Sequence, residues 1–221
     1  MREGYVQRVG GLAVLGAVAL LGACLEPIPA PSRTTPAGVV VLEALHQLKT
    51  GTVGITDRRR ATYVLVDVEN RTAELRRVTV VGQLLDDAGA VLAQLPHQML
   101  QVPAGERRTF AMPAVAAVPA ARRATVQVHD APVDRHPFDV VVTEVRFDRE
   151  EDVFAATLRV VSRSDRATVA SIAATFYDDA GRPLARPFMV LPFAPGQSRP
   201  LRLEGPLAAT RGTAFVTEVQ Y

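Results

Sequence analysis

The sequence carries the same four residues, Asp-Asp-Ala-Gly, at 86–89 and again at 178–181. The paired carboxylates of either copy could bind a metal ion or act as acid and base in catalysis. They could also close a hairpin, because the first aspartate can cap backbone amides and glycine tolerates the positive φ of a tight turn. Adjacent strand residues point to opposite faces of a sheet, and a calcium loop normally supplies more oxygen ligands. We therefore favour a turn at each copy over a metal site.

The histidines are the other candidate metal ligands. Four stand apart in the sequence: His46, His97, His129 and His136. None of them shows the short spacing of a metal site, but segment 129–138 joins the last two with Asp130 and Asp134. Two prolines interrupt the polar and apolar alternation there, so we interpret this segment as a solvated linker rather than a ligand cluster.

The sequence contains none of the common catalytic motifs, such as Gly-x-Ser-x-Gly, a phosphate loop or His-Glu-x-x-His. We therefore expect a protein that is not an enzyme and that uses no cofactor. A hydrolase with an unrecognised site is the least favoured alternative, and a cleft with clustered, perturbed carboxylates would revive it.

The chain's one cysteine, Cys24, follows an apolar run from Val9 to Ala23. This run is shorter than the roughly 20 residues of a membrane-spanning helix, and it follows a short segment with two arginines, as in a secretory signal peptide. It ends in Leu21-Gly22-Ala23-Cys24, which resembles the lipobox of bacterial lipoproteins. The resemblance implies cleavage before the cysteine and a diacylglyceryl group on its thiol, usually with a third acyl chain. Two or more chains hold a protein stably at a membrane.

A proline-rich segment follows the cysteine, with four prolines among residues 25–38. Such a segment forms neither a helix nor a sheet ladder, and at roughly 3.1 Å per residue it reaches about 40 Å. We expect a signal peptide over 1–23 and a lipidated tether over 24–38. Leu25 is not the aspartate that resembles an inner-membrane retention signal, which favours the outer membrane where the organism has one. A plain signal peptide or short membrane anchor with an incidental cysteine is the alternative.

Composition limits the partners of the folded part. Hydrophobic residues make up 48% of the chain and charged residues 22%, which is typical of a globular protein. With a net charge of +2, no strong field draws the molecule to nucleic acid. Arginines of the first half could form a basic contact face for lipid phosphates, although a solvated surface is the default. They are Arg58, Arg59, Arg60, Arg76, Arg77, Arg107 and Arg108, with the pair Arg122 and Arg123 beside them.

From Val39 onward the hydrophobic pattern has a period of two residues, which indicates half-buried strands. Sliding the sequence by 92 residues aligns segment 62–70 with 154–162 and the two Asp-Asp-Ala-Gly copies with each other. We infer an internal duplication. The short, evenly spaced strands predict an all-β chain of two tandem immunoglobulin-like antiparallel β-sandwiches, at 39–128 and 139–221, joined by the linker at 129–138.

The pattern also predicts which residues fill the two cores. They are Val64, Val66, Val68, Val80, Leu84, Phe110 and Met112 in the first copy, and Leu158, Val160, Ile172, Phe176, Leu201 and Leu203 in the second. In segment 62–70 the core valines alternate with residues on the opposite face of the strand, which are Tyr63, Leu65, Asp67 and Glu69. Segment 114–124 is interrupted by Pro119, so we expect a loop there before a last strand near 125–128.

Segments 84–110 and 176–201 are similar to the FxLYD-type domain, a bacterial immunoglobulin-like module, through the apolar-Tyr-Asp strand end, the glycine turn and a later Pro-Gly-polar turn. The sequence departs from the family at the Phe position, where Gly82 and Ala174 stand, and only Tyr177 matches the Tyr. A related β-sandwich family of envelope lipoproteins is the alternative. The resemblance implies an architecture and no catalytic site.

Together these features predict a cell-envelope protein with a non-catalytic binding or scaffolding role and a protein partner in the envelope. The membrane contact would be made through the lipid on Cys24. A carrier or chaperone that holds a small ligand or an unfolded client between the sandwiches is the second hypothesis, and a large apolar pocket there would favour it.

Overall fold

The computed structural model describes residues 38–42, 47–53 and 59–221, and all regular elements in these ranges are β-strands. The expected all-β class is confirmed. The first half contains β1 (Val39–Val41), β2 (Gln47–Val53), β3 (Arg59–Asn70), β4 (Arg76–Leu85), β5 (Val91–Val102), β6 (Arg107–Pro113) and β7 (Arg123–Asp130). The second contains β8 (Val140–Arg149), β9 (Phe154–Ser162), β10 (Thr168–Tyr177), β11 (Pro183–Ala185), β12 (Phe188–Phe193), β13 (Ser198–Gly205) and β14 (Arg211–Gln220). The predicted signal peptide, the lipobox with Cys24, the tether up to residue 37, and Arg58 lie outside the described residues.

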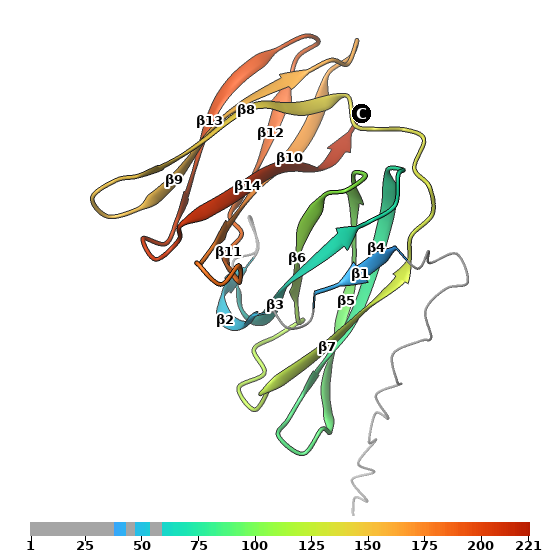
Figure 1. Cartoon of the computed structure of the whole chain (residues 1–221), viewed down its shortest axis with the longest axis vertical. Coiled ribbons are helices and arrows are strands. Elements are labelled where there is room, and N and C mark those ends of the chain that lie inside the picture. Colours follow the sequence, from blue (N-terminus) through green and yellow to red (C-terminus); the bar gives the residue numbers. More distant parts are fainter. Residues whose placement is uncertain (1–37, 43–46, 54–58) are drawn as a thin grey trace, which may run out of the picture.

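Each half contains two antiparallel sheets, and the strand order is the same in both. In the first half, β3 lies between β6 and the pair β1 and β2, while β4 lies between β5 and β7. In the second half, β9 lies between β13 and β8, while β10 lies between β14 and the pair β11 and β12. In Figure 1 the halves form two lobes, with β11 and β14 on the side of the second lobe that faces the first. The repeated order agrees with a duplicated immunoglobulin-like sandwich.

The hydrogen bonds that link strand ends repeat as well. The Asn70 amide donates to the carbonyl of Glu106, as the Ser162 amide donates to that of Gln197, both over 2.9 Å. The connection 114–122 has no strand, and β7 begins beside the predicted position. The duplication therefore preserves backbone geometry although few side chains are identical.

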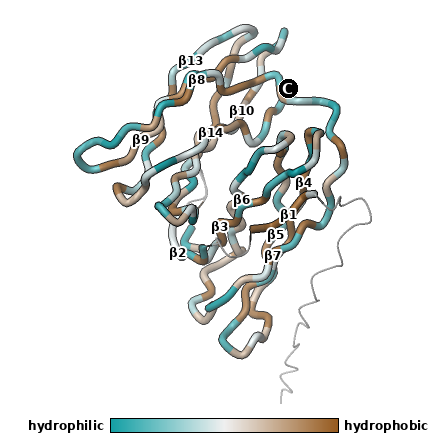
Figure 2. The backbone as a smooth tube through the Cα atoms, viewed as in Figure 1, coloured by the Kyte–Doolittle hydropathy of each residue, from teal (hydrophilic) through white to brown (hydrophobic). Residues whose placement is uncertain are grey.

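All thirteen predicted core residues are buried, from Val64, which is fully covered, to Leu201, which is 8% exposed. They belong to two separate clusters, one enclosed by each pair of sheets. Figure 2 shows the corresponding hydrophobic stretches on the strands of both lobes. Side chains of this size contribute about 1.5–3 kcal/mol each when buried, so each sandwich has its own source of stability.

The prediction that β3 is half-buried was wrong, because both of its faces are covered. Leu65 and Asp67, on the face opposite the core, are 1% and 0% exposed. The second sandwich covers this face: its residues Ala173 on β10 and Phe215 on β14 belong to the buried cluster of the first sandwich. The outer face of β3 and β6 thus packs against the outer face of β10 and β14.

The linker predicted over 129–138 is a solvated segment only in part. Strand β7 continues to Asp130, and Ala131 is fully buried in the first core. Asp134 is also buried, because its carboxylate accepts hydrogen bonds from Arg77 Nε over 3.0 Å and Gln101 Nε2 over 2.7 Å. Burial alone would raise the pKa of Asp134, but these bonds and one from the His136 backbone hold it below its usual range. The segment is therefore fixed to the first sandwich before the chain continues to β8.

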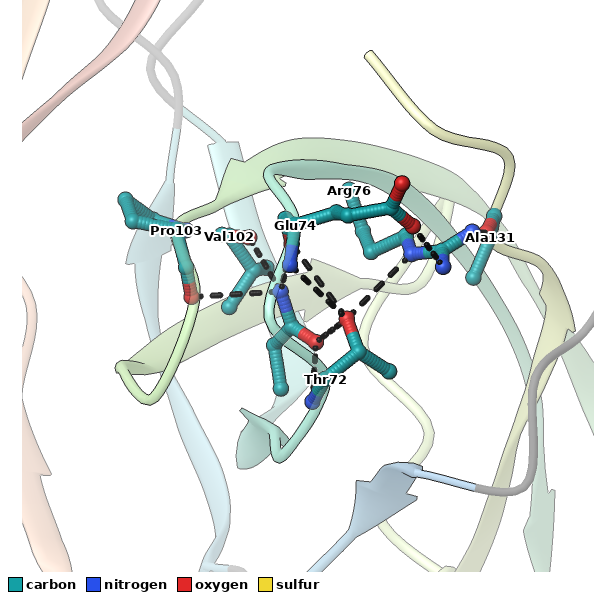
Figure 3. Close-up of polar contacts among 7 residues, drawn as sticks. Thr72, Glu74, Arg76, Val102, Pro103 and Ala131 are labelled. Carbon is teal, nitrogen blue, oxygen red and sulfur yellow. Dashed lines mark hydrogen bonds and ion pairs between the residues drawn. The ribbon is translucent and has the colours of Figure 1, made fainter.

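Asn70 closes one end of the first sandwich at the close of β3. Its Nδ2 donates to the carbonyls of Glu74 over 2.7 Å and Val102 over 2.8 Å, while its Oδ1 accepts from the Thr72 amide over 3.0 Å. Figure 3 shows these contacts joining the turn after β3 to the end of β5. The equivalent residue of the second copy, Ser162, is too short to do this, and its buried Oγ has no hydrogen-bond partner among the described residues.

Replacing Asn70 with Ala should lower the free energy of unfolding by about 2–4 kcal/mol, because the buried Val102 carbonyl and several part-buried backbone groups lose their partner at once. Ser162→Ala is the matched control at the equivalent position, and it should be close to neutral since its hydroxyl satisfies no other group. Urea unfolding followed by circular dichroism measures both. Equal effects of the two substitutions would contradict this account.

Candidate functional site

Both Asp-Asp-Ala-Gly copies form hairpin turns of the same geometry, as predicted. Asp86 Oδ1 accepts from the Ala90 amide and Asp178 Oδ1 from the Arg182 amide, each over 2.8 Å. The glycine of each copy has a positive φ, 88° at residue 89 and 80° at residue 181, which explains why glycine stands there. The first aspartate of each pair therefore caps a turn.

The candidate arginines in the described ranges are not gathered on one face. Arg59 and Arg60 open β3, whereas Arg107 lies beside Glu69 at the far end of the same strand. Several of them have carboxylate partners of their own: Arg76 pairs with Glu74, Arg77 with Asp134, Arg107 with Asp67 and Arg108 with Glu106. Arg107 and Arg108 take part in the contact between the sandwiches and do not belong to an open surface.

Within the described ranges, no three His, Cys, Asp or Glu side chains lie together as metal ligands would. No helix in those ranges is long and apolar enough to cross a membrane. The groups that converge most closely lie elsewhere, between the two sandwiches.

A buried polar network joins the sandwiches, and Asp67 of β3 is at its centre. Its carboxylate accepts from Arg107 Nε over 2.6 Å and from the Thr109 hydroxyl, both on β6. The Thr109 hydroxyl also lies 2.9 Å from the hydroxyl of Tyr177 on β10, and the Tyr177 hydroxyl is 3.5 Å from the same carboxylate oxygen of Asp67. Since Thr109 has one proton and directs it at the carboxylate, Tyr177 donates in this second bond. Arg107 in turn donates to the Gly181 carbonyl over 2.8 Å.

Aromatic rings of the second sandwich lie against arginines around this network. The Tyr177 ring has the Arg107 guanidinium 5.0 Å and the Arg211 guanidinium 5.8 Å from its centre. The Phe215 ring has the Arg108 guanidinium at 4.7 Å. Cation–π contacts of this kind contribute about 0.5–2 kcal/mol each, more when desolvated, and they add to the hydrogen bonds between the halves.

Burial dominates the ionisation of this network. It raises the pKa of Asp67 above its ordinary value, although the bonds from Thr109 and Arg107 act in the opposite direction. It also raises the pKa of Tyr177, with the neighbouring Asp67 charge adding to the effect. Tyr177 therefore stays protonated and remains a hydrogen-bond donor at physiological pH.

Next to the network, the two sandwiches form the walls of a cavity of about 900 Å³ that is open to solvent. Its walls come from β2, β3, β5 and β6 of the first half and from β10, β11, β12, β13 and β14 of the second, together with the β11–β12 connection. The lining includes Tyr63, Leu65, Ala111, Arg186, Phe188 and Thr217. A space of this size and mixed lining is within the range of small-molecule sites in proteins.

The network was not predicted from the sequence. A pocket between the sandwiches was named as the feature that would favour a carrier, but the sequence did not indicate the strands that line it. Asp67 did give a signal, since it is a carboxylate between valines in the middle of an apolar strand. A charge in that position is either on a solvated face or paired, and the pattern alone does not distinguish the two.

Comparison with known proteins gives no family. No family model matches the chain, and no curated protein matches it. One similar solved structure is the N-terminal CBM22-1-CBM22-2 tandem domain of Paenibacillus barcinonensis Xyn10C, with 7% identity and a TM-score of 0.15 over 84% of this chain and 87% of that one. A likeness this weak carries no argument about what this chain binds.

Removing the Tyr177 hydroxyl tests whether the network holds the sandwiches together. Tyr177→Phe should lower the free energy of unfolding by about 1 kcal/mol, because one buried hydrogen bond between the halves is lost. Tyr221→Phe is the control, since that hydroxyl donates to Asp139 at an exposed site. Chemical denaturation measures the free energy of unfolding of both variants. A Tyr177→Phe chain as stable as the Tyr221→Phe control would contradict the role of this bond.

The raised pKa of Asp67 predicts the sign of a pH effect. The folded state binds the Asp67 proton more tightly than the unfolded state does. The resulting stabilisation is therefore complete below pH 3.8, the ordinary pKa of the carboxyl group. It is lost as the pH rises through the higher pKa of Asp67 in the folded state. Asn does not titrate, so the stability of the native chain minus that of Asp67→Asn should fall with rising pH in that window. Denaturation of both chains at a series of pH values measures this difference, and a difference that grows with pH would contradict it.

Proposed function

We propose that this protein is a lipid-anchored protein of the cell envelope with a non-catalytic binding or scaffolding role. The lipobox-like Leu21-Gly22-Ala23-Cys24 and the proline-rich segment after it support attachment through Cys24. The observation that carries the binding role is the buried Asp67 network, because it fastens two sandwiches into one unit. A fixed pair of sandwiches presents two sets of strand edges in a constant arrangement to a partner.

The partner surface that we favour is the edge of β12, which pairs only with β10 among the described strands. Three consecutive apolar residues there, Phe188, Met189 and Val190, are each about two-fifths exposed. An open edge strand can add a strand from a partner, and apolar side chains strengthen such a contact. An envelope protein is therefore the partner that we expect.

A carrier function is the second candidate, and the cavity between the sandwiches is the observation that favours it. Its volume suits a small ligand better than an extended unfolded chain. This candidate is compatible with the same lipid anchor.

Replacing Cys24 with Ser should move the protein from the membrane fraction to the soluble fraction, because the acyl chains would have no attachment point. Ser32→Ala, a change in the same proline-rich segment outside the lipobox-like motif, should leave the protein in the membrane fraction. Sedimentation of cell fractions followed by immunodetection measures both. Continued sedimentation of the Cys24 variant with membranes would refute the lipid anchor.

A further inference from the structure

Arg186 lies where the cavity between the sandwiches meets their buried contact. It belongs to the short connection between β11 and β12 and lines the cavity. Its guanidinium is 5.5 Å from the centre of the Phe215 ring, which is itself only 4% exposed. The side chain is thus held at one place in the wall.

This arginine differs from its neighbours because it has no anion of its own. Arg107 and Arg108 are paired with Asp67 and Glu106, whereas no carboxylate among the described residues lies within ion-pair distance of Arg186. Its Nε is buried and has no hydrogen-bond partner in the described part of the chain. A buried polar group without a partner is costly, and an anion would satisfy it.

Arg186 is still charged under physiological conditions. Burial lowers its pKa to about 10, which is still well above neutral pH. A guanidinium protonated at neutral pH and partly removed from water offers parallel N–H donors to a carboxylate or a phosphate.

Apolar side chains also line the cavity. Met99 is 55% exposed and Phe188 is 42% exposed, while Tyr63 and Ala111 are partly covered. Such surfaces favour hydrocarbon over a fully hydrated ion.

Two carboxylates also line the cavity, and both are exposed. Glu204 accepts from Arg202 Nε over 3.2 Å, and Glu218 accepts from Gln220 Nε2 over 2.9 Å. They lie on β13 and β14, outside ion-pair distance of Arg186, and they would repel an anion that bound near them. The anionic group of a ligand is therefore directed to Arg186.

We infer that the cavity binds an amphiphilic anion, with its carboxylate or phosphate group on Arg186 and its apolar part against Tyr63, Met99 and Phe188. This inference rests on the carrier function and is independent of the lipid anchor, so the membrane-release experiment and the binding experiment can fail separately.

Calorimetric titration of the full chain carrying Cys24→Ser tests the inference without acyl chains or detergent. The probes are decanoate, decanol and decyltrimethylammonium below their aggregation concentrations, with acetate and inorganic phosphate as head groups alone. Decanoate should bind most tightly, because it alone combines the apolar chain with a negative charge. Acetate or phosphate binding as tightly as decanoate would overturn the apolar part of the inference, and preferred binding of the cation would overturn the anionic part.

Arg186→Gln should weaken decanoate binding about tenfold or more, in line with the strength of a charge-assisted hydrogen bond, and leave decanol binding unchanged. The control is Arg146→Gln, which removes an exposed arginine of β8 that does not line the cavity. Unchanged decanoate affinity in the Arg186 variant would refute the site. A second variant, Ala111→Leu, narrows the cavity while keeping Arg186. It provides the test if Arg186→Gln does not fold. Decanoate affinity should fall in Ala111→Leu, and an unchanged affinity would also refute the site.

Discussion

The position of the second sandwich depends on one carboxylate, that of Asp67, which is completely buried between sheets from different halves. An ionised carboxylate is stable there only when charge and hydrogen bonds compensate the loss of water, and removing the opposite charge of a buried ion pair typically costs about 3–5 kcal/mol. Arg107 and Thr109 supply part of this compensation from the first half. The Tyr177 hydroxyl completes it from the second half, which couples the burial of the charge to the docking of the two sandwiches.

The network is not part of the duplicated unit. At the positions equivalent to Asp67, Thr109 and Tyr177 the other copy has Arg159, Pro200 and Leu85, which cannot form these bonds. The two copies also use different sheets, since the first contributes β3 and β6 and the second contributes β10 and β14. The contact is therefore heterologous, and each copy presents a different outer face to it.

The sequence predicted those features that depend on local pattern. A period of two residues identified every core position that was named, and the first aspartate and glycine of each Asp-Asp-Ala-Gly copy indicated the turns. The same pattern could not show that Leu65 and Asp67 are buried, because periodicity tells which residues share a face and not what covers that face. Asp134 was misjudged for a related reason, since its partners Arg77 and Gln101 lie on other strands. Contacts between distant segments decided each of these cases.

The network and the cavity share two strands, and the register between them explains how both arise. Along β3 and β6 the pairs run from Asp67 with Thr109, through Leu65 with Ala111, to Tyr63 with Pro113. The first pair meets the second sandwich directly, while the later pairs line the cavity. Twisted sheets that pack face to face diverge away from their closest contact, so fixing them at Asp67 leaves the space open further along the same strands. A change that loosens the network should therefore alter the cavity even where no cavity residue is replaced.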